Sequence, residues 1–152
     1  MRREAPFAFV FGDGIVRGFL DVAGVERDGT MLIVDYKSDR VADGEDLAAR
    51  VERDYAIQRE VYALAALRAG AGAVEVAHCF LRRPELVLSA RYGARERERL
   101  EASLATRVAP LRAGRFEVTP EPGLERCAGC PGRARLCSYD EAMTSRESLL
   151  PA

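Results

Sequence analysis

The sequence predicts a mixed α/β fold in one domain, in which a three-strand antiparallel meander is followed by a long helix. Two observations carry this prediction. The first 37 residues contain three β-prone apolar stretches separated by glycine turns, and from about residue 47 apolar residues recur at helical spacing. A chain of 152 residues with 48% hydrophobic content can bury one substantial core and gives little support for two.

The meander is predicted from its two turns. Residues 7–11 and 15–25 are apolar stretches broken by Gly12-Asp13-Gly14, which is a strong turn signal. A third strand, Met31–Lys37, follows Arg27-Asp28-Gly29, which suits a three-residue hairpin loop with glycine in the left-handed conformation. We therefore expect three consecutive antiparallel strands.

A long helix is predicted over residues 47–69, ending at Gly70. Its apolar stripe contains Leu47, Val51, Tyr55, Gln58, Tyr62, Ala65 and Ala66. We assign Tyr55 to the core. Residues 74–81 then read as a buried strand and residues 86–92 as its partner, and residues 95–112 form a second, charged helix.

Charge and hydropathy exclude two classes of protein. The formal net charge of -1 and the pI near 6.0 argue against a passive DNA-coating protein. No stretch approaches the roughly 18 to 20 apolar residues that cross a bilayer, and the first residues lack the apolar core of a signal peptide. We expect a cytoplasmic protein with no membrane partner, whose cysteines are thiols or metal ligands rather than disulfides.

Lys37 stands out by composition alone. Of the 23 basic residues, 22 are arginine and only Lys37 is lysine. A solvated surface charge tolerates either residue, whereas a compact ammonium with an adjustable pKa cannot be replaced by a planar guanidinium. The bias marks Lys37 as a candidate functional residue.

The predicted register brings two acids together. With a loop at residues 27–29, Glu26 pairs with Thr30, and Asp21 falls directly opposite Asp35. Like charges in that position destabilise a sheet unless a cation bridges them. Lys37 lies on the same face as Asp35, among apolar neighbours that would partly desolvate the group. The alternative is a surface hairpin with ordinary charges.

These residues resemble a known family. Gly18-Phe19-Leu20-Asp21, Ile33-Val34-Asp35-Tyr36-Lys37-Ser38 and the helical pair Gln58 and Tyr62 are similar to the RecB-like branch of PD-(D/E)XK nucleases. The resemblance implies a restriction-endonuclease-like mixed sheet with an antiparallel meander and flanking helices, a Cys-containing C-terminal loop, and DNA as the partner.

The resemblance also implies roles for individual residues. Asp21 and Asp35 would bind Mg²⁺ or Mn²⁺, Lys37 would assist the attacking water, and Gln58 and Tyr62 would shape the active site and the DNA path. The carbonyl of Tyr36 is expected to be a further metal ligand. We therefore expect a metal-dependent deoxyribonuclease.

The C-terminal tail carries a second candidate site. We expect residues 1–119 to form the nuclease core and residues 120–152 a loop-dominated tail, where Cys127, Cys130 and Cys137 have a compact, ligand-like spacing. The tail is similar to that of helicase-nucleases that hold a 4Fe-4S cluster, with the fourth ligand outside this chain. Cys79 is interpreted as a buried strand residue.

The family usually supplies a His or Glu ligand on a helix before the first strand, and the sequence shows no such helix. His78, the only histidine, is interpreted as a core or strand residue. We therefore expect the C-terminal part of a larger polypeptide, a UvrD-like helicase-nuclease of double-strand break repair, with ATP used only by the helicase.

Two other hypotheses remain open at this point. A catalytically inactive RecB-like domain could serve as a structural or DNA-guiding module. Alternatively, Cys127, Cys130 and Cys137 could build a small zinc-binding interaction domain.

Overall fold

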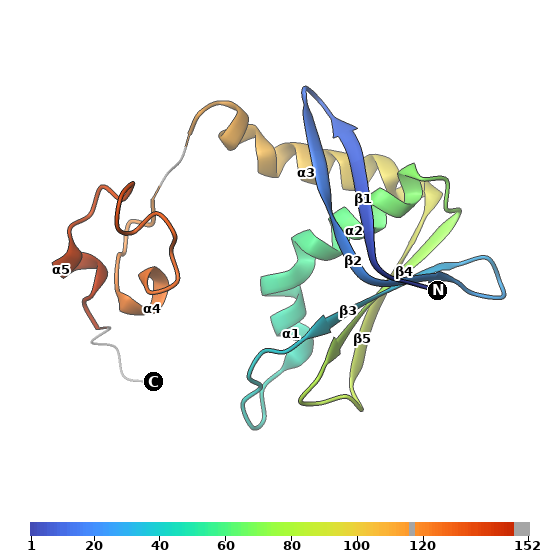
Figure 1. Cartoon of the computed structure of the whole chain (residues 1–152), viewed down its shortest axis with the longest axis horizontal. Coiled ribbons are helices and arrows are strands. Elements are labelled where there is room, and N and C mark those ends of the chain that lie inside the picture. Colours follow the sequence, from blue (N-terminus) through green and yellow to red (C-terminus); the bar gives the residue numbers. More distant parts are fainter. Residues whose placement is uncertain (116–117, 148–152) are drawn as a thin grey trace. The chain divides into compact units, whose positions relative to one another are not determined.

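The computed structural model describes residues 1–115 and 118–147, and the chain divides into two compact units, Met1–Val108 and Ala109–Ala152. The first unit is a sheet with helices packed on one face (Figure 1). No helix in the described part of the chain is both long and apolar enough to span a membrane.

The sheet has five strands in the order β1-β2-β3-β4-β5. β3 and β4 are parallel, and every other neighbouring pair is antiparallel. The strands are β1 (Arg2–Phe11), β2 (Gly14–Val25), β3 (Met31–Lys37), β4 (Ala73–Phe80) and β5 (Val87–Gly93). The predicted mixed α/β fold, with its antiparallel meander and flanking helices, is confirmed.

Both predicted turns of the meander form. Gly12 adopts a φ of 61° between β1 and β2, and Gly29 adopts a φ of 85° between β2 and β3, a conformation that costs glycine little. The amide of Glu26 donates to the carbonyl of Thr30 at 2.9 Å, which closes the three-residue loop. The hairpin register predicted from this loop is confirmed.

The long helix predicted over residues 47–69 forms with one interruption. It consists of α1 (Leu47–Arg50), a π-helical turn η1 (Val51–Tyr55) and α2 (Ala56–Arg68). The Asp46 carboxylate accepts hydrogen bonds from the first free amides of α1, as an N-cap does. Gly70 has a φ of 100° and ends the helix, as predicted.

The core lies between the sheet and these helices. α2 buries Tyr62 to Leu67 against the sheet, and Ile33, Val74 and Val76 are fully buried beneath it. A 3-10 turn η2 (Ala94–Glu96) leads into α3 (Arg97–Arg112), whose Leu100 and Leu104 complete the same core. The predicted second helix is thereby confirmed.

β1 begins five residues earlier than the hydropathy pattern predicted. Arg2 and Arg3 pair with Ala23 and Val22 of β2, although neither is a favoured strand residue. β1 is an edge strand of the sheet. Pro6, which has no amide hydrogen to donate, is tolerated there because an edge strand has a neighbouring strand on one side only. The partner strand, and not the local sequence, determines this start.

The second unit contains two short helices, α4 (Leu124–Cys127) and α5 (Glu141–Thr144). The amide of Leu124 donates to the carbonyl of Arg146 at 2.9 Å, so the start of α4 lies beside the segment that follows α5. The Nε of Arg133 donates to the hydroxyl of buried Thr144 at 3.1 Å.

Candidate active site

The candidate site lies where the helical segment covers the end of β3. Asp35 and Lys37 are 2% and 8% exposed and share the helix-facing side of the strand, while Tyr36 between them is 49% exposed. Gln58 and Tyr62, one helical turn apart on α2, face the same place. The predicted partial desolvation of this face is confirmed.

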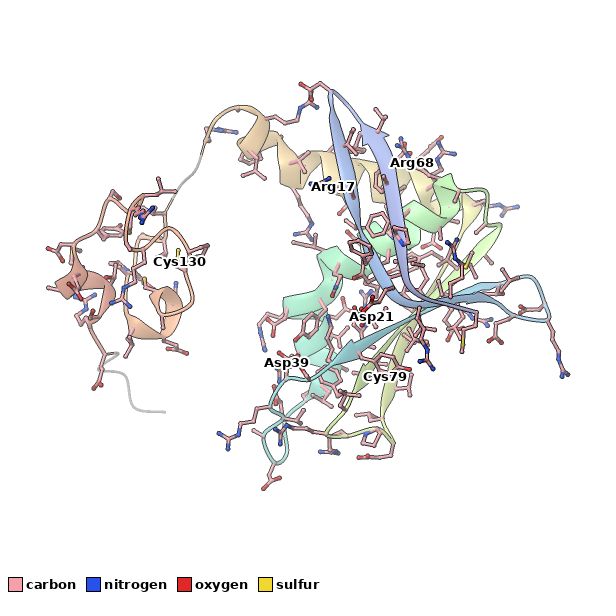
Figure 2. All side chains as sticks on the ribbon, in the orientation of Figure 1. Arg17, Asp21, Asp39, Arg68, Cys79 and Cys130 are labelled. Carbon is pink, nitrogen blue, oxygen red and sulfur yellow. The ribbon has the colours of Figure 1, made fainter. Side chains whose placement is uncertain are left out.

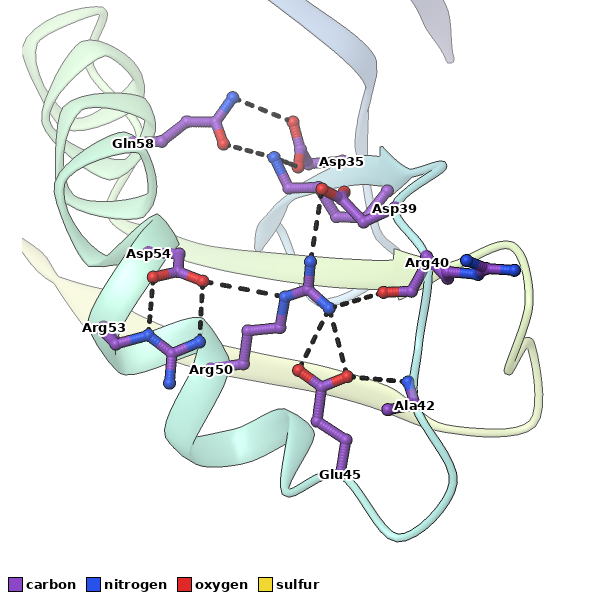
Figure 3. Close-up of polar contacts among 10 residues, drawn as sticks. Asp35, Asp39, Arg40, Ala42, Glu45, Arg50, Arg53, Asp54 and Gln58 are labelled. Atoms are coloured by element: carbon purple, nitrogen blue, oxygen red, sulfur yellow. Dashed lines mark hydrogen bonds and ion pairs between the residues drawn. The ribbon is translucent and has the colours of Figure 1, made fainter. Parts of the chain in front are cut away.

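A buried ion pair forms the centre of the site (Figure 3). Lys37 Nζ lies 2.6 Å from Asp35 Oδ2 and donates to Gln58 Oε1 at 2.6 Å. The amide nitrogen of Gln58 donates to Asp35 Oδ1 at 3.2 Å. One glutamine therefore contacts both charged partners, with its oxygen on the cation and its nitrogen on the anion.

Tyr62 completes this network. Its hydroxyl lies 2.8 Å from Gln58 Nε2, which donates to it, and the hydroxyl donates to Asp35 Oδ1 at 3.5 Å. Burial first, and then the charges of Asp35 and Asp21, raise the pKa of Tyr62, so the phenol stays protonated. Both carboxylates therefore lie close enough to Tyr62 to influence its ionisation.

Asp21 approaches β3 in register but not as a regular ladder pair. The β2–β3 pairing runs from Val25 with Met31 to Val22 with Val34. One step further, the Asp21 carboxylate accepts a hydrogen bond from the Tyr36 amide at 2.9 Å. The predicted register is confirmed over these four pairs, whereas the predicted direct pairing of Asp21 with Asp35 is not among them.

Asp21 is open to solvent on one side. A cleft of about 640 Å³ is lined by Arg3, Glu4, Asp21, Val22 and Tyr36. Figure 2 shows Asp21 at the base of the β1–β2 hairpin, near the crossing of the strands. A ligand can therefore reach the Asp21 carboxylate from this cleft.

The donor set fits a hard divalent cation. Asp35 Oδ2 is buried and makes no well-aligned hydrogen bond, because it faces Lys37 at ion-pair distance only. Mg²⁺ is commonly held by one or two carboxylates and keeps several waters. Among residues 1–115 and 118–147, no group of three or more His, Cys, Asp or Glu side chains is arranged to hold a metal.

An arginine ties the loop after β3 to the helix (Figure 3). Arg50 contacts the carboxylates of Asp39, Glu45 and Asp54 at 3.4, 3.1 and 3.7 Å. Its guanidinium also donates to the carbonyl of Arg40 at 2.8 Å. The chain leaving Lys37 is thereby fixed against α1, which limits the movement of the motif itself.

Two aromatic residues contact the site that the sequence did not assign to it. Tyr55 packs against the core cluster of Leu47, Val51 and Phe80, as predicted, and its ring centroid also lies 4.0 Å from Lys37 Nζ. His78 is a fully buried strand residue, as predicted, but it pairs in register with Asp35 and stacks on Tyr55 at 5.7 Å. The helical spacing of Tyr55, Gln58 and Tyr62 could have placed Tyr55 at the site. The parallel β3–β4 register, which places His78 beside Asp35, could not be predicted from the sequence.

The cysteines occupy different environments, and all are free thiols. In the second unit, Cys127 is buried, whereas Cys130 and Cys137 line a cleft of about 730 Å³ together with apolar residues. Within the described residues these three thiols do not form a metal-binding cluster. Cys79 lies in β4 and is half-buried, not buried as predicted, and its partial desolvation raises the pKa of its thiol.

Protonation of His78 is expected to destabilise the fold. Burial lowers the pKa of His78 from its ordinary value of 6.5, and the Asp35 charge opposes this only in part. Below pH 6.5 the unfolded chain therefore binds a proton that the folded chain does not. The contribution of the neutral His78 to the free energy of unfolding is complete above pH 6.5 and is lost as the pH falls through the lowered pKa of the folded protein. The free energy of unfolding is measured by urea titration at about pH 7.5 and about pH 5.5. It should fall more between these two pH values in the natural protein than in His78→Phe.

Because His78 is the only histidine, the difference between the two proteins isolates its titration. Equal losses in both proteins would contradict this account of the buried imidazole.

The sequence profile of the PD-(D/E)XK nuclease superfamily matches residues 2–137. No curated protein matches the chain. A solved structure described as "Crystal structure of SSO0001" aligns with a TM-score of 0.44 and 15% identity, over 86% of this chain and 56% of that one. This chain thus spans little more than half the length of that protein. Since the profile covers most of the chain, the protein belongs to the PD-(D/E)XK nuclease superfamily.

Proposed function

We propose that this chain is a divalent-metal-dependent deoxyribonuclease module whose active residues are Asp21, Asp35, Lys37, Gln58 and Tyr62. The observation that carries the proposal is the buried Lys37–Asp35 ion pair, contacted at both ends by Gln58. A buried charge pair is a costly way to stabilise a sheet, and functional sites are where such groups are retained. Superfamily membership supports the same conclusion.

Each residue has a role that its contacts support. Lys37 presents the only ammonium side chain of the protein beside a carboxylate that would hold the cation, where it can orient a water or stabilise a developing negative charge. Gln58 fixes the relative position of Lys37 and Asp35. Tyr62, kept protonated by its surroundings, restrains Asp35 Oδ1.

Asp21 and Asp35 would hold Mg²⁺ or Mn²⁺, with the carbonyl of Tyr36 as a further ligand. A cation bound there supplies positive charge that polarises the scissile phosphate. DNA is the proposed substrate. We further propose that the module works with a UvrD-like helicase in double-strand break processing, and that ATP is used only by that motor.

A second candidate function has one observation in its favour. Within the described residues, no three His, Cys, Asp or Glu side chains are grouped so that they could hold a metal ion. A nuclease fold with a weakened metal site would act as a structural or DNA-guiding module. Cleavage assays separate the two functions.

Replacing Lys37 tests the proposal. Lys37→Ala should lower kcat for nicking of single- or double-stranded DNA in Mg²⁺ or Mn²⁺ by about 100- to 10,000-fold, because general acid–base and charge-stabilising groups contribute on this scale. Lys37→Arg keeps the charge but not the compact ammonium and should restore little activity. Arg82→Ala, at an exposed position of the same unit, is the control.

Equal cleavage by the natural protein and Lys37→Ala would rule out the catalytic assignment. Absence of cleavage in the natural protein, with retained DNA binding, would favour the structural module.

For the tail, we propose that Cys127, Cys130 and Cys137 bind a 4Fe-4S cluster with a fourth ligand from outside this chain. Their spacing in the sequence is the support for this ligand set, since the described structure does not group the three thiols. Anaerobic reconstitution should give visible iron-sulfur absorption that Cys127→Ser and Cys130→Ser abolish and Cys79→Ser leaves intact. A chromophore that survives both tail substitutions would exclude the cluster, and stoichiometric zinc without iron would favour a zinc site.

A further inference from the structure

The Lys37 ammonium has three contacts, and the site described above accounts for two of them, Asp35 and Gln58. Asp35 Oδ2 and Gln58 Oε1 each lie 2.6 Å from Nζ. The third contact is the ring of Tyr55, whose centroid lies 4.0 Å from Nζ. An ammonium has three N–H donors. One is bonded to Gln58 Oε1, and Asp35 Oδ2 lies against the ammonium as an ion pair without an aligned hydrogen bond, so at least one N–H direction has no oxygen acceptor in this set.

We propose that Tyr55 is a positioning residue for Lys37, whose ring face holds the ammonium through a cation–π contact. This inference rests on the proposed function of Lys37. An aromatic face attracts the cation without fixing an N–H in one direction, as an oxygen acceptor would. The third donor therefore stays available to a water or a substrate oxygen while the charge is kept in place.

The Tyr55 ring packs against two aromatic side chains of β4. His78 stacks on it with ring centroids 5.7 Å apart, and Phe80 packs edge-on at 6.2 Å. Both are fully buried. In the parallel β3–β4 pairing, His78 lies beside Asp35 and Phe80 beside Lys37. His78 and Phe80, the β4 partners of Asp35 and Lys37, thus pack the Tyr55 ring against the lysine.

The complete burial of His78 is consistent with this packing role. Neither ring nitrogen makes a hydrogen bond within the described structure. Well-aligned hydrogen bonds therefore do not account for the position of this histidine. Its planar face, stacked on Tyr55, is the contact that the structure assigns to it.

The helix geometry presents Tyr55 at the required place. Tyr55 is the last residue of the π-helical turn, with φ -121° and ψ 0°, outside the α-helical region. Gln58 follows at i+3 and Tyr62 at i+7, so all three side chains lie along one face of the helical segment. Single π-turns in helices are frequent at functional sites.

The single lysine allows a direct test by NMR. In the full chain labelled with ¹³C,¹⁵N-lysine, only Lys37 gives a side-chain signal. Protons above an aromatic face are shifted upfield, so the Lys37 ε-protons should resonate upfield of free lysine and show contacts to the Tyr55 ring protons. Tyr55→Phe should keep the shift, and Tyr55→Leu should remove it.

Kinetics test the consequence for the reaction. With the ring removed, Tyr55→Leu should lower kcat by roughly 2- to 30-fold with KM for DNA unchanged, and Tyr55→Phe should stay near the natural value. An upfield shift that persists in Tyr55→Leu, or free-lysine shifts in the natural protein, would overturn the proposal. So would an unchanged kcat in Tyr55→Leu when the natural protein is active.

The two readouts separate this inference from the proposed function. If the protein cleaves no DNA, the nuclease proposal fails, while the lysine spectrum still decides whether Tyr55 holds the ammonium. If Tyr55→Leu does not fold, the ring contacts in the natural protein and in Tyr55→Phe decide the same question.

Discussion

The buried ion pair between Lys37 and Asp35 is the interaction on which the rest of the site depends. Each charge would be strongly disfavoured at this depth without the other, because an unpaired buried ion loses its hydration without compensation. Gln58 satisfies a remaining donor of the lysine and a remaining acceptor of the aspartate. The helix that carries Gln58 is thereby tied to the strand that carries both charges.

This constraint connects the fold to the site in two directions. Along the sheet, the glycine of the three-residue loop sets the hairpin register, which brings Asp21 to the end of β3. Across the sheet, the parallel partner β4 supplies the aromatic side chains that hold Tyr55 over the lysine. Arg50 then fixes the loop that follows the motif. A small sheet thus places two acids and one lysine, and the helix adds one amide.

Much of this arrangement could be predicted from the sequence because it depends on local rules. Turn chemistry predicted the hairpin register, strand alternation placed Lys37 beside Asp35, and helical spacing predicted the helix with Gln58 and Tyr62. The earlier start of β1, the π-turn ending at Tyr55 and the pairing of His78 with Asp35 depend on partners distant in sequence. No periodicity in the segments themselves encodes them.

A double-mutant cycle on the ion pair tests the central claim most directly. The free energy of unfolding is measured by urea titration, without divalent cations, for the natural protein, Asp35→Asn, Lys37→Met and the double variant. Each single change should cost about 3 to 5 kcal/mol because it leaves one buried group uncompensated, and the double variant should be more stable than either. Losses that add to within about 0.5 kcal/mol would show that the two charges are independent and would contradict the account.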